Sequence, residues 1–252
     1  MLKAILERFR QGHRTMAYPD APLPMPPRFR GLPVLDASFC TDGCRACVES
    51  CPYGALSANG TLALDMGCCL FCGDCRDACP QGAITFSTDA CLSSRTRQGF
   101  TVTSGEAYHP AHALEGELLK LFGRSLKLRE VSAAGCNACE ADTNVLSTIG
   151  WDLGRFGIQF VASPRHADGL WVTGPVTEHM YEAMMMTWEA IPAPKIVVAC
   201  GACAINGGPY LDSSECRNGV EGILPVDLYI PGCPPHPVTI LDGLLRLLDR
   251  MP

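Results

Sequence analysis

Cysteine is the residue type whose number and spacing indicate chemistry, because sixteen of the 252 residues are cysteine. Six of them lie in two copies of one pattern, Cys-x-x-Cys-x-x-x-Cys-Pro-x-Gly-Ala, at residues 44–55 and 72–83. Thiolates bind iron and zinc, so the pattern indicates metal binding. A repeat this short cannot bury a core alone, and we expect the two copies to pack together.

The second copy, preceded by another cysteine, has the spacing Cys-x2-Cys-x2-Cys-x3-Cys-Pro of bacterial two-cluster ferredoxins. Three thiolates on a tight loop reach three corners of a cubane, and the fourth cysteine serves the other cluster. We therefore expect a small α+β domain of the bacterial two-[4Fe–4S] ferredoxin type over residues 36–90. The first cluster is assigned to Cys40, Cys44, Cys47 and Cys79, and the second to Cys51, Cys69, Cys72 and Cys75.

The first copy departs from this spacing at one place. Three residues, instead of two, separate Cys40 from Cys44. Gly43 lies in that segment, and a glycine allows the loop to absorb an extra residue. The alternatives are a three-iron cluster or a different ligand at the first corner.

From residue 126 onward, short apolar runs alternate with helical patterns, which is typical of a parallel sheet covered by helices. We expect residues 126–252 to form an α/β, flavodoxin-like parallel-sheet domain. Strands are predicted over residues 126–131, 158–162, 169–172, 195–199 and 226–230, and helices over residues 144–155, 177–189 and 238–250. Such sheets bind ligands beyond the carboxyl ends of their strands. The cysteines that follow predicted strands are Cys136, Cys139, Cys200, Cys203 and Cys233.

Two Cys-x2-Cys pairs in this second group make zinc the first candidate metal. Zinc ribbons separate such pairs by roughly 15–20 residues, whereas about sixty residues lie between Cys139 and Cys200. The segment 231–237 around Cys233 is rich in proline, which makes it a rigid loop suited to holding an iron–sulfur cluster.

Composition limits the class of protein. The net charge of −6 argues against a protein that coats nucleic acid. No apolar run approaches the roughly 18 residues of a membrane span, and the N-terminus lacks the apolar centre of a secretory signal. A disulfide framework, which suits short secreted chains, therefore does not explain the cysteines.

Residues 1–35 are expected to form a helix followed by an arm. Leu2, Ile5, Leu6 and Phe9 fall on one face of a helix over residues 1–15. Five prolines between residues 19 and 27 then predict an extended arm. We expect the arm to lie against a partner subunit; the alternative is a flexible linker. Residues 91–125 are a predicted connector with a helix near residues 113–122.

Four motifs in order, at residues 135–140, 172–177, 201–208 and 226–235, resemble the small subunit of energy-converting, group 4 nickel–iron hydrogenases of the formate-hydrogenlyase type. That family is related to the 20 kDa subunit of respiratory complex I, which carries its cluster N2. Residues 1–90 resemble the ferredoxin-like, two-cluster subunit of the same complexes. The chain thus resembles a natural fusion of two neighbouring subunits.

The resemblance implies a proximal [4Fe–4S] cluster, which brings the expected number of clusters to three. Cys200 is then a spare thiol, and Cys68, Cys91 and Cys216 receive no role. Glu140 is either a proton-relay carboxylate or a solvated acid at a helix start. The proximal ligands implied by the family motifs are Cys136, Cys139, Cys203 and Cys233.

The implied function is electron transfer within an oxidoreductase, with the catalytic nickel–iron or quinone site mainly in a partner subunit. The implied partners are a hydrogenase large subunit, similar to the 49 kDa subunit of complex I, and other soluble and membrane subunits. The chain itself is expected to bind no nucleic acid, to lack a membrane span, and to lie in the cytoplasm at the cytoplasmic face of the inner membrane. Two alternatives stay open: a quinone-reducing module like that of complex I, an NADH-quinone oxidoreductase, and a zinc-binding or regulatory iron–sulfur protein without electron throughput.

Overall fold

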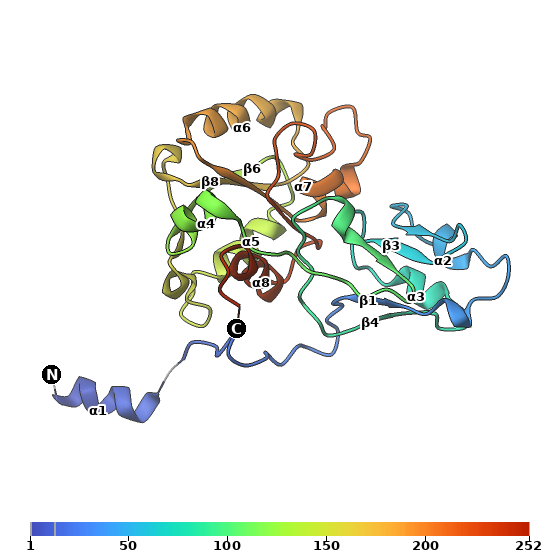
Figure 1. Cartoon of the computed structure of the whole chain (residues 1–252), viewed down its shortest axis with the longest axis horizontal. Helices are drawn as coiled ribbons and strands as arrows, with labels where there is room; N and C mark the ends of the chain where they lie inside the picture. The colour runs from blue at the N-terminus through green and yellow to red at the C-terminus, as the bar shows by residue number, and fades with distance from the viewer. Residues whose placement is uncertain (1, 13, 252) are drawn as a thin grey trace.

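The computed structural model of the chain describes residues 2–12 and 14–251, which form two packed units and a projecting N-terminal helix, α1 (Leu2–Gln11) (Figure 1). The first unit holds the two cysteine repeats. Its elements are β1 (Pro33–Leu35), α2 (Ala46–Glu49), β2 (Leu56–Ser57), β3 (Ala63–Asp65), α3 (Asp74–Ala78), β4 (Ile84–Phe86) and β5 (Thr101–Thr103).

The second unit is built on a five-stranded parallel sheet. Its strands are β6 (Leu126–Ser132), β7 (Ile158–Phe160), β8 (Gly169–Thr173), β9 (Ile196–Cys200) and β10 (Leu228–Ile230). Their order across the sheet is β7-β6-β8-β9-β10, and every pairing is parallel. Counted along the chain, this is the 2-1-3-4-5 order of flavodoxin-like sheets. The expected fold class is therefore confirmed, and each predicted strand is found.

Helices cover both faces of this sheet. Figure 1 shows α6 (Glu178–Ala190) on one face, with α5 (Ala138–Val145) and α8 (Pro237–Leu247) on the other. Leu170 and Val172 of β8 belong to the hydrophobic cluster that contains Met184 of α6. Trp171, between them, belongs to the cluster that contains Ile240 and Leu244 of α8. Strands buried on both faces need no polar alternation, which explains why β8 and β9 are almost wholly apolar.

One predicted helix, over residues 144–155, is wrong in its boundaries. Helix α5 begins at Ala138, directly after the Cys136 loop, and ends at Val145. Asp152 takes a positive φ of 48°, which an α-helix cannot contain. The apolar residues that suggested a helix there instead enter the core through a turn and a short 3-10 segment, Leu153–Phe156.

The first unit brings the two cysteine repeats together, as expected. Helix α2 from the first copy packs against α3 from the second. Strands β1 and β4 pair antiparallel and join the start of the unit to its end. Strand β5, which lies in the segment predicted as a connector, completes an antiparallel sheet with β2 and β3. The connector is thus partly built into the first unit.

The two units share one interface. Arg97 of the connector pairs with Asp65 of the first unit, at 2.7 and 2.8 Å, and with Glu221 of the second unit, at 3.4 Å. Ser94 and Tyr229 exchange two backbone hydrogen bonds. Buried side chains from both units, such as Leu64 and Val172, belong to one hydrophobic cluster. The units therefore form a single packed body.

The proline-rich arm, expected against a partner subunit, also contacts its own chain. The N–H of Met16 donates to the carbonyl of Gly150 at 2.8 Å. Arg155 donates to the carbonyls of Met16 and Tyr18 at 2.8 and 2.7 Å. The arm then reaches the first unit, where Gly31 N–H donates to the Ser87 carbonyl. These hydrogen bonds lie at the two ends of the arm, on either side of its prolines, which have no backbone N–H to donate.

A buried carboxylate fastens the arm. Asp242 of α8 has no exposed surface, and it accepts hydrogen bonds from Tyr18 Oη at 2.7 Å and from Arg246 Nε at 2.8 Å. The thiol of Cys91 lies 3.4 Å from the same carboxylate. Burial and the nearby Asp242 raise the pKa of Tyr18, so its hydroxyl stays protonated and donating. Arm, connector and last helix meet at this point.

Two further helices complete the second unit, α4 (Gly116–Phe122) and α7 (Ala202–Asn206). Among the described residues, no helix has the length and apolar character needed to cross a membrane.

Replacing Tyr18 by Phe should loosen the arm, because the buried carboxylate of Asp242 loses a donor. We expect the free energy of unfolding to fall by about 2 kcal/mol, and trypsin to cleave faster after Arg28. Anaerobic urea denaturation and timed proteolysis measure both effects. Tyr210→Phe, at a residue 40% exposed, is the matched control. Equal behaviour of the two variants would contradict the proposed fastening.

Candidate iron–sulfur cluster sites

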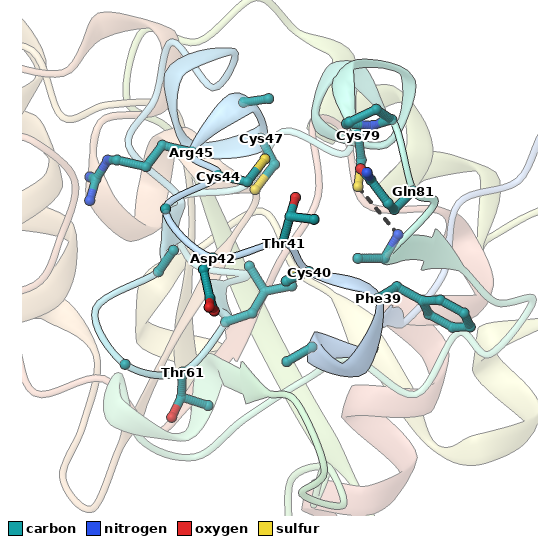
Figure 2. Close-up of a pocket in the computed structure, with 18 residues that line it drawn as sticks. Phe39, Cys40, Thr41, Asp42, Cys44, Arg45, Cys47, Thr61, Cys79 and Gln81 are labelled. Carbon is teal, nitrogen blue, oxygen red and sulfur yellow. Dashed lines mark hydrogen bonds between the residues drawn. The ribbon is translucent and has the colours of Figure 1, made fainter.

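The four cysteines assigned to the first cluster line a single pocket of about 410 Å³ (Figure 2). Cys47 comes from α2, Cys79 caps the end of α3, and Cys40 and Cys44 come from the loop before α2. Cys79 thus leaves its own repeat and joins the other, as the spacing predicts. The N–H of Ala83 donates to Cys79 Sγ at 3.2 Å.

The extra residue in the first loop has a visible structural consequence. Gly43 takes a φ of 75°, in the left-handed region, and a Cβ there would meet open space. The loop therefore turns at this glycine, in a backbone conformation that favours glycine. Cys40 lies exposed at the rim of the pocket, whereas Cys47 is buried.

The cysteines assigned to the second cluster also share one pocket, which Cys51, Cys69, Cys72 and Cys75 line together. Burial, with a smaller contribution from the neighbouring thiols, raises the pKa of Cys69 to about 12 and that of Cys75 to about 11. The N–H of Phe71 opposes this effect at Cys69 by donating to its sulfur at 3.3 Å. Cys47 of the first pocket contributes to the raised pKa of Cys75, so the two pockets are neighbours.

The third set, Cys136, Cys139, Cys203 and Cys233, lines a pocket at the carboxyl edge of the parallel sheet. Cys136 and Cys233 lie in the loops after β6 and β10, whereas Cys139 and Cys203 lie in the first turns of α5 and α7, the helices that follow β6 and β9. Close backbone approach shapes the pocket, because a Cβ on Gly174 would lie 2.6 Å from Gly135 N. A Cβ on Gly201, which has a φ of 91°, would lie 2.5 Å from Cys139 Sγ. Glycine is needed at both places.

The pKa values of the thiols in this third pocket indicate which kind of metal group the pocket can hold. Burial, then the nearby thiols of Cys233 and Cys136, raise the pKa of Cys203 to about 12. Burial and the nearby thiol of Cys203 also raise the pKa of Cys139. Four crowded thiolates repel one another unless a cation lies between them, and a bound metal deprotonates its thiol ligands. The donor set therefore fits a cationic iron–sulfur core.

The remaining cysteines lie outside these three pockets. Cys68 lies 3.3 Å from Asp65 Oδ2 and accepts from Arg97 and Asn206, so it belongs to the interface between the units. Cys200 is fully buried at the end of β9. Cys91 contacts Asp242, and Cys216 forms a backbone bridge with Thr177. Across residues 2–12 and 14–251, no three His, Cys, Asp or Glu side chains are close enough to hold a single metal ion.

A pocket of about 230 Å³ separates the second cysteine set from the third. It is lined by Phe71 from the second cysteine loop, by Cys233 and His236 from the third, and by Arg28 and Arg30 of the arm. Arg30 donates to the Phe71 carbonyl at 3.2 Å. Sequence reasoning missed Arg30, and the only signal was a pair of arginines at the end of the proline-rich arm.

Arg30 also packs onto the second cysteine loop. A Cβ on Gly73, at the start of α3, would lie 2.9 Å from Arg30 Nε. Phe29 packs its ring edge-on against His236, with ring centroids 5.3 Å apart. The arm thus places one guanidinium and one ring between the two cysteine sets.

Glu140 is held inside the protein, so the expectation of a solvated acid is wrong. It is buried and accepts hydrogen bonds from Ser132 at 2.5 Å and from Thr173 at 2.7 Å. Glu130 lies nearby; burial, then the charge of Glu140, raises its pKa to about 7.

Comparison with known proteins agrees with this fold. Residues 136–247 match the family described as NADH ubiquinone oxidoreductase, 20 Kd subunit. A probable membrane-bound hydrogenase subunit of Pyrococcus furiosus is 41% identical over 135 residues, 54% of this chain and 81% of that protein. Formate hydrogenlyase subunit 7 of Escherichia coli is 41% identical over 139 residues, 55% of this chain and 54% of that protein.

A subunit of the NADH-quinone oxidoreductase of Citrifermentans bemidjiense is 44% identical over 117 residues, 46% of this chain and 68% of that protein. These relatives are subunits of oxidoreductases. The chain belongs to the 20 kDa subunit family of NADH ubiquinone oxidoreductase, whose members include both hydrogenase and complex I subunits.

Two neighbouring cysteines provide a matched test of the third pocket. Cys203→Ala should lower the iron content by about four atoms per chain, because a [4Fe–4S] cluster loses a ligand. Cys200→Ala should keep the iron, because Cys200 does not line the pocket. Iron and sulfide assays of anaerobically purified protein measure this. Iron loss in both variants, or in neither, would contradict the assignment.

Proposed function

We propose that the chain is the electron-transfer subunit of a membrane-associated, energy-converting nickel–iron hydrogenase complex of the formate-hydrogenlyase type. The observation that supports this proposal is the convergence of twelve cysteines, four at a time, on three pockets in one packed body. When bound, a [4Fe–4S] cluster at each pocket supplies a one-electron relay, and together the clusters connect a donor to the partner large subunit for proton reduction or H2 oxidation.

The side chains of this chain determine where electrons enter and leave. Cys40 is exposed at the rim of the first pocket, which suits contact with a donor. Cys136 and Cys233 are exposed at the third pocket, which suits coverage by a large subunit that carries the catalytic site. In the second pocket Cys69 and Cys75 are buried and Cys72 is exposed.

The location follows from the partners. We place the chain in the cytoplasm, peripheral on the cytoplasmic face of the inner membrane, together with a large subunit and further soluble and membrane subunits. A probable membrane-bound hydrogenase subunit is among its relatives, which supports this placement.

A quinone-reducing module of the complex I type is the second candidate, favoured by the 44% identity to a subunit of an NADH-quinone oxidoreductase. The spacing Cys136-x2-Cys139 favours the hydrogenase, because the complex I branch to which the chain is similar typically has adjacent cysteines there. The partner discriminates between the two: a large subunit with two Cys-x2-Cys nickel-binding pairs indicates hydrogenase.

Iron content and electron paramagnetic resonance test the proposal directly. Anaerobically purified protein should contain about twelve iron atoms per chain and show three reducible cubane clusters. Colourless protein with stoichiometric zinc would instead indicate the zinc-binding alternative. Four iron atoms or fewer would defeat the proposal.

Arg30 should influence the potentials of the two clusters that it separates, because a positive charge stabilises a reduced cluster. Arg30→Gln should lower the midpoint potential of the second or third cluster by on the order of 40 mV, which corresponds to about 1 kcal/mol for one electron. Arg30→Lys should retain part of the wild-type value. Redox titration followed by paramagnetic resonance measures the shift.

The control is Arg165→Gln, which removes the same charge from an exposed position outside the pocket between these sets. Potentials that are equal in the Arg30 and Arg165 variants would show that the guanidinium of Arg30 does not act on the clusters.

A further inference from the structure

Helix α1 is the one described α-helix that has no buried residue, and it projects from the packed body (Figure 1). Its large apolar side chains are exposed, from 53% for Ile5 to 83% for Phe9. Successive helical residues turn by about 100°, so Leu2, Ile5, Leu6 and Phe9 form one continuous stripe. A stripe of this kind is covered by something when the protein works.

The charges around this stripe indicate what covers it. Lys3 and Arg10 lie along one edge of the stripe, and Arg8 lies along the other edge. Glu7, the acidic residue of the helix, lies on the opposite face, where it pairs with Arg10 at 3.5 Å. Basic residues at both edges and an acid on the far side are typical of a helix lying in the plane of a membrane surface.

The charge of the helix also contrasts with that of the whole chain. Helix α1 carries three basic residues and one acidic residue, whereas the chain has a net charge of −6. Lysine and arginine side chains can bury their methylene stems and extend their charges to lipid phosphates. An anionic bilayer attracts such a segment.

The segment that connects α1 to the packed body also favours a membrane surface as the partner of the helix. The chain contacts the packed body at Met16, whose N–H donates to the Gly150 carbonyl. Ile149, next to Gly150 in the sequence, is 79% exposed. An exposed apolar side chain outside α1 thus lies where the connecting segment, residues 12–15, joins the packed body. Arg14, in the connecting segment, adds a basic residue next to the helix.

We propose that α1 is an interfacial helix that inserts its stripe of Leu2, Ile5, Leu6 and Phe9 into an anionic phospholipid bilayer. This inference goes beyond the proposed function, because it gives the chain its own contact with lipid in addition to contacts with membrane subunits. Fastening of the arm through Tyr18 and Arg155 then holds the packed body close to the bilayer surface.

Vesicle sedimentation of the full-length, cluster-loaded chain tests the proposal. One set of vesicles contains equal parts of phosphatidylglycerol and phosphatidylcholine, and the other contains phosphatidylcholine alone. We expect binding to the anionic vesicles, weaker binding to the neutral vesicles, and release of part of the bound protein by salt. No binding, or equal binding to both kinds of vesicle, would overturn the proposal.

Matched variants locate the contact. Phe9→Gln should weaken binding to anionic vesicles about tenfold, because it removes buried apolar surface. Ala4→Gln places the same side chain on the opposite face and should leave binding unchanged. Arg10→Gln should weaken binding about fivefold, and Glu7→Gln should strengthen it. Equal binding of the Phe9 and Ala4 variants would overturn the proposal.

A tryptophan at either position gives a second measurement that does not depend on affinity. Phe9→Trp fluorescence should be quenched by lipids with brominated chains, whereas Ala4→Trp fluorescence should not. Quenching that is equal at the two positions would place the helix on a protein partner or in solution. Iron content is measured in every preparation, so that loss of clusters, which counts against the proposed function, is kept separate from loss of vesicle binding.

Discussion

Repulsion between crowded thiolates is the constraint on which this structure depends. Three pockets each gather four cysteine sulfurs, and the buried thiols among them have raised pKa values because burial and their neighbours disfavour the charge. The repulsion therefore arises when a bound metal displaces the thiol protons. The protein holds the sulfurs together with backbone geometry: helices α2 and α3 pack against each other, and glycines such as Gly174 and Gly201 allow backbone and sulfur to approach closely.

Much of this arrangement could be predicted from the sequence. Cysteine spacing is a local property, so the two ferredoxin-type sets could be written down from the repeat alone, including the exchange of Cys51 and Cys79 between copies. The order of apolar runs likewise predicted a parallel sheet with cysteines at its carboxyl edge. Membership of the third set was less local: spacing left Cys200 and Cys203 both possible, and the resemblance selected Cys203, which lines the pocket.

Other features depend on contacts between distant residues and could not be predicted. The arm was expected on a partner because nothing in its prolines indicates that Tyr18 will meet Asp242, 224 positions away. Arg30 was missed for the same reason, since its importance comes from the two loops it separates. The helix predicted over residues 144–155 starts too late, because the apolar periodicity of that segment does not reveal the positive φ that Asp152 adopts in the fold.

The exchange of cysteines between repeats has a consequence for assembly of the proposed clusters. Neither ferredoxin-type pocket has four sulfurs until both repeats are folded against each other, since Cys79 completes the first and Cys51 the second. On the proposed assignment, a cluster in one pocket would hold both repeats together and would thereby order the other pocket. Assembly of the two proposed clusters would then be cooperative.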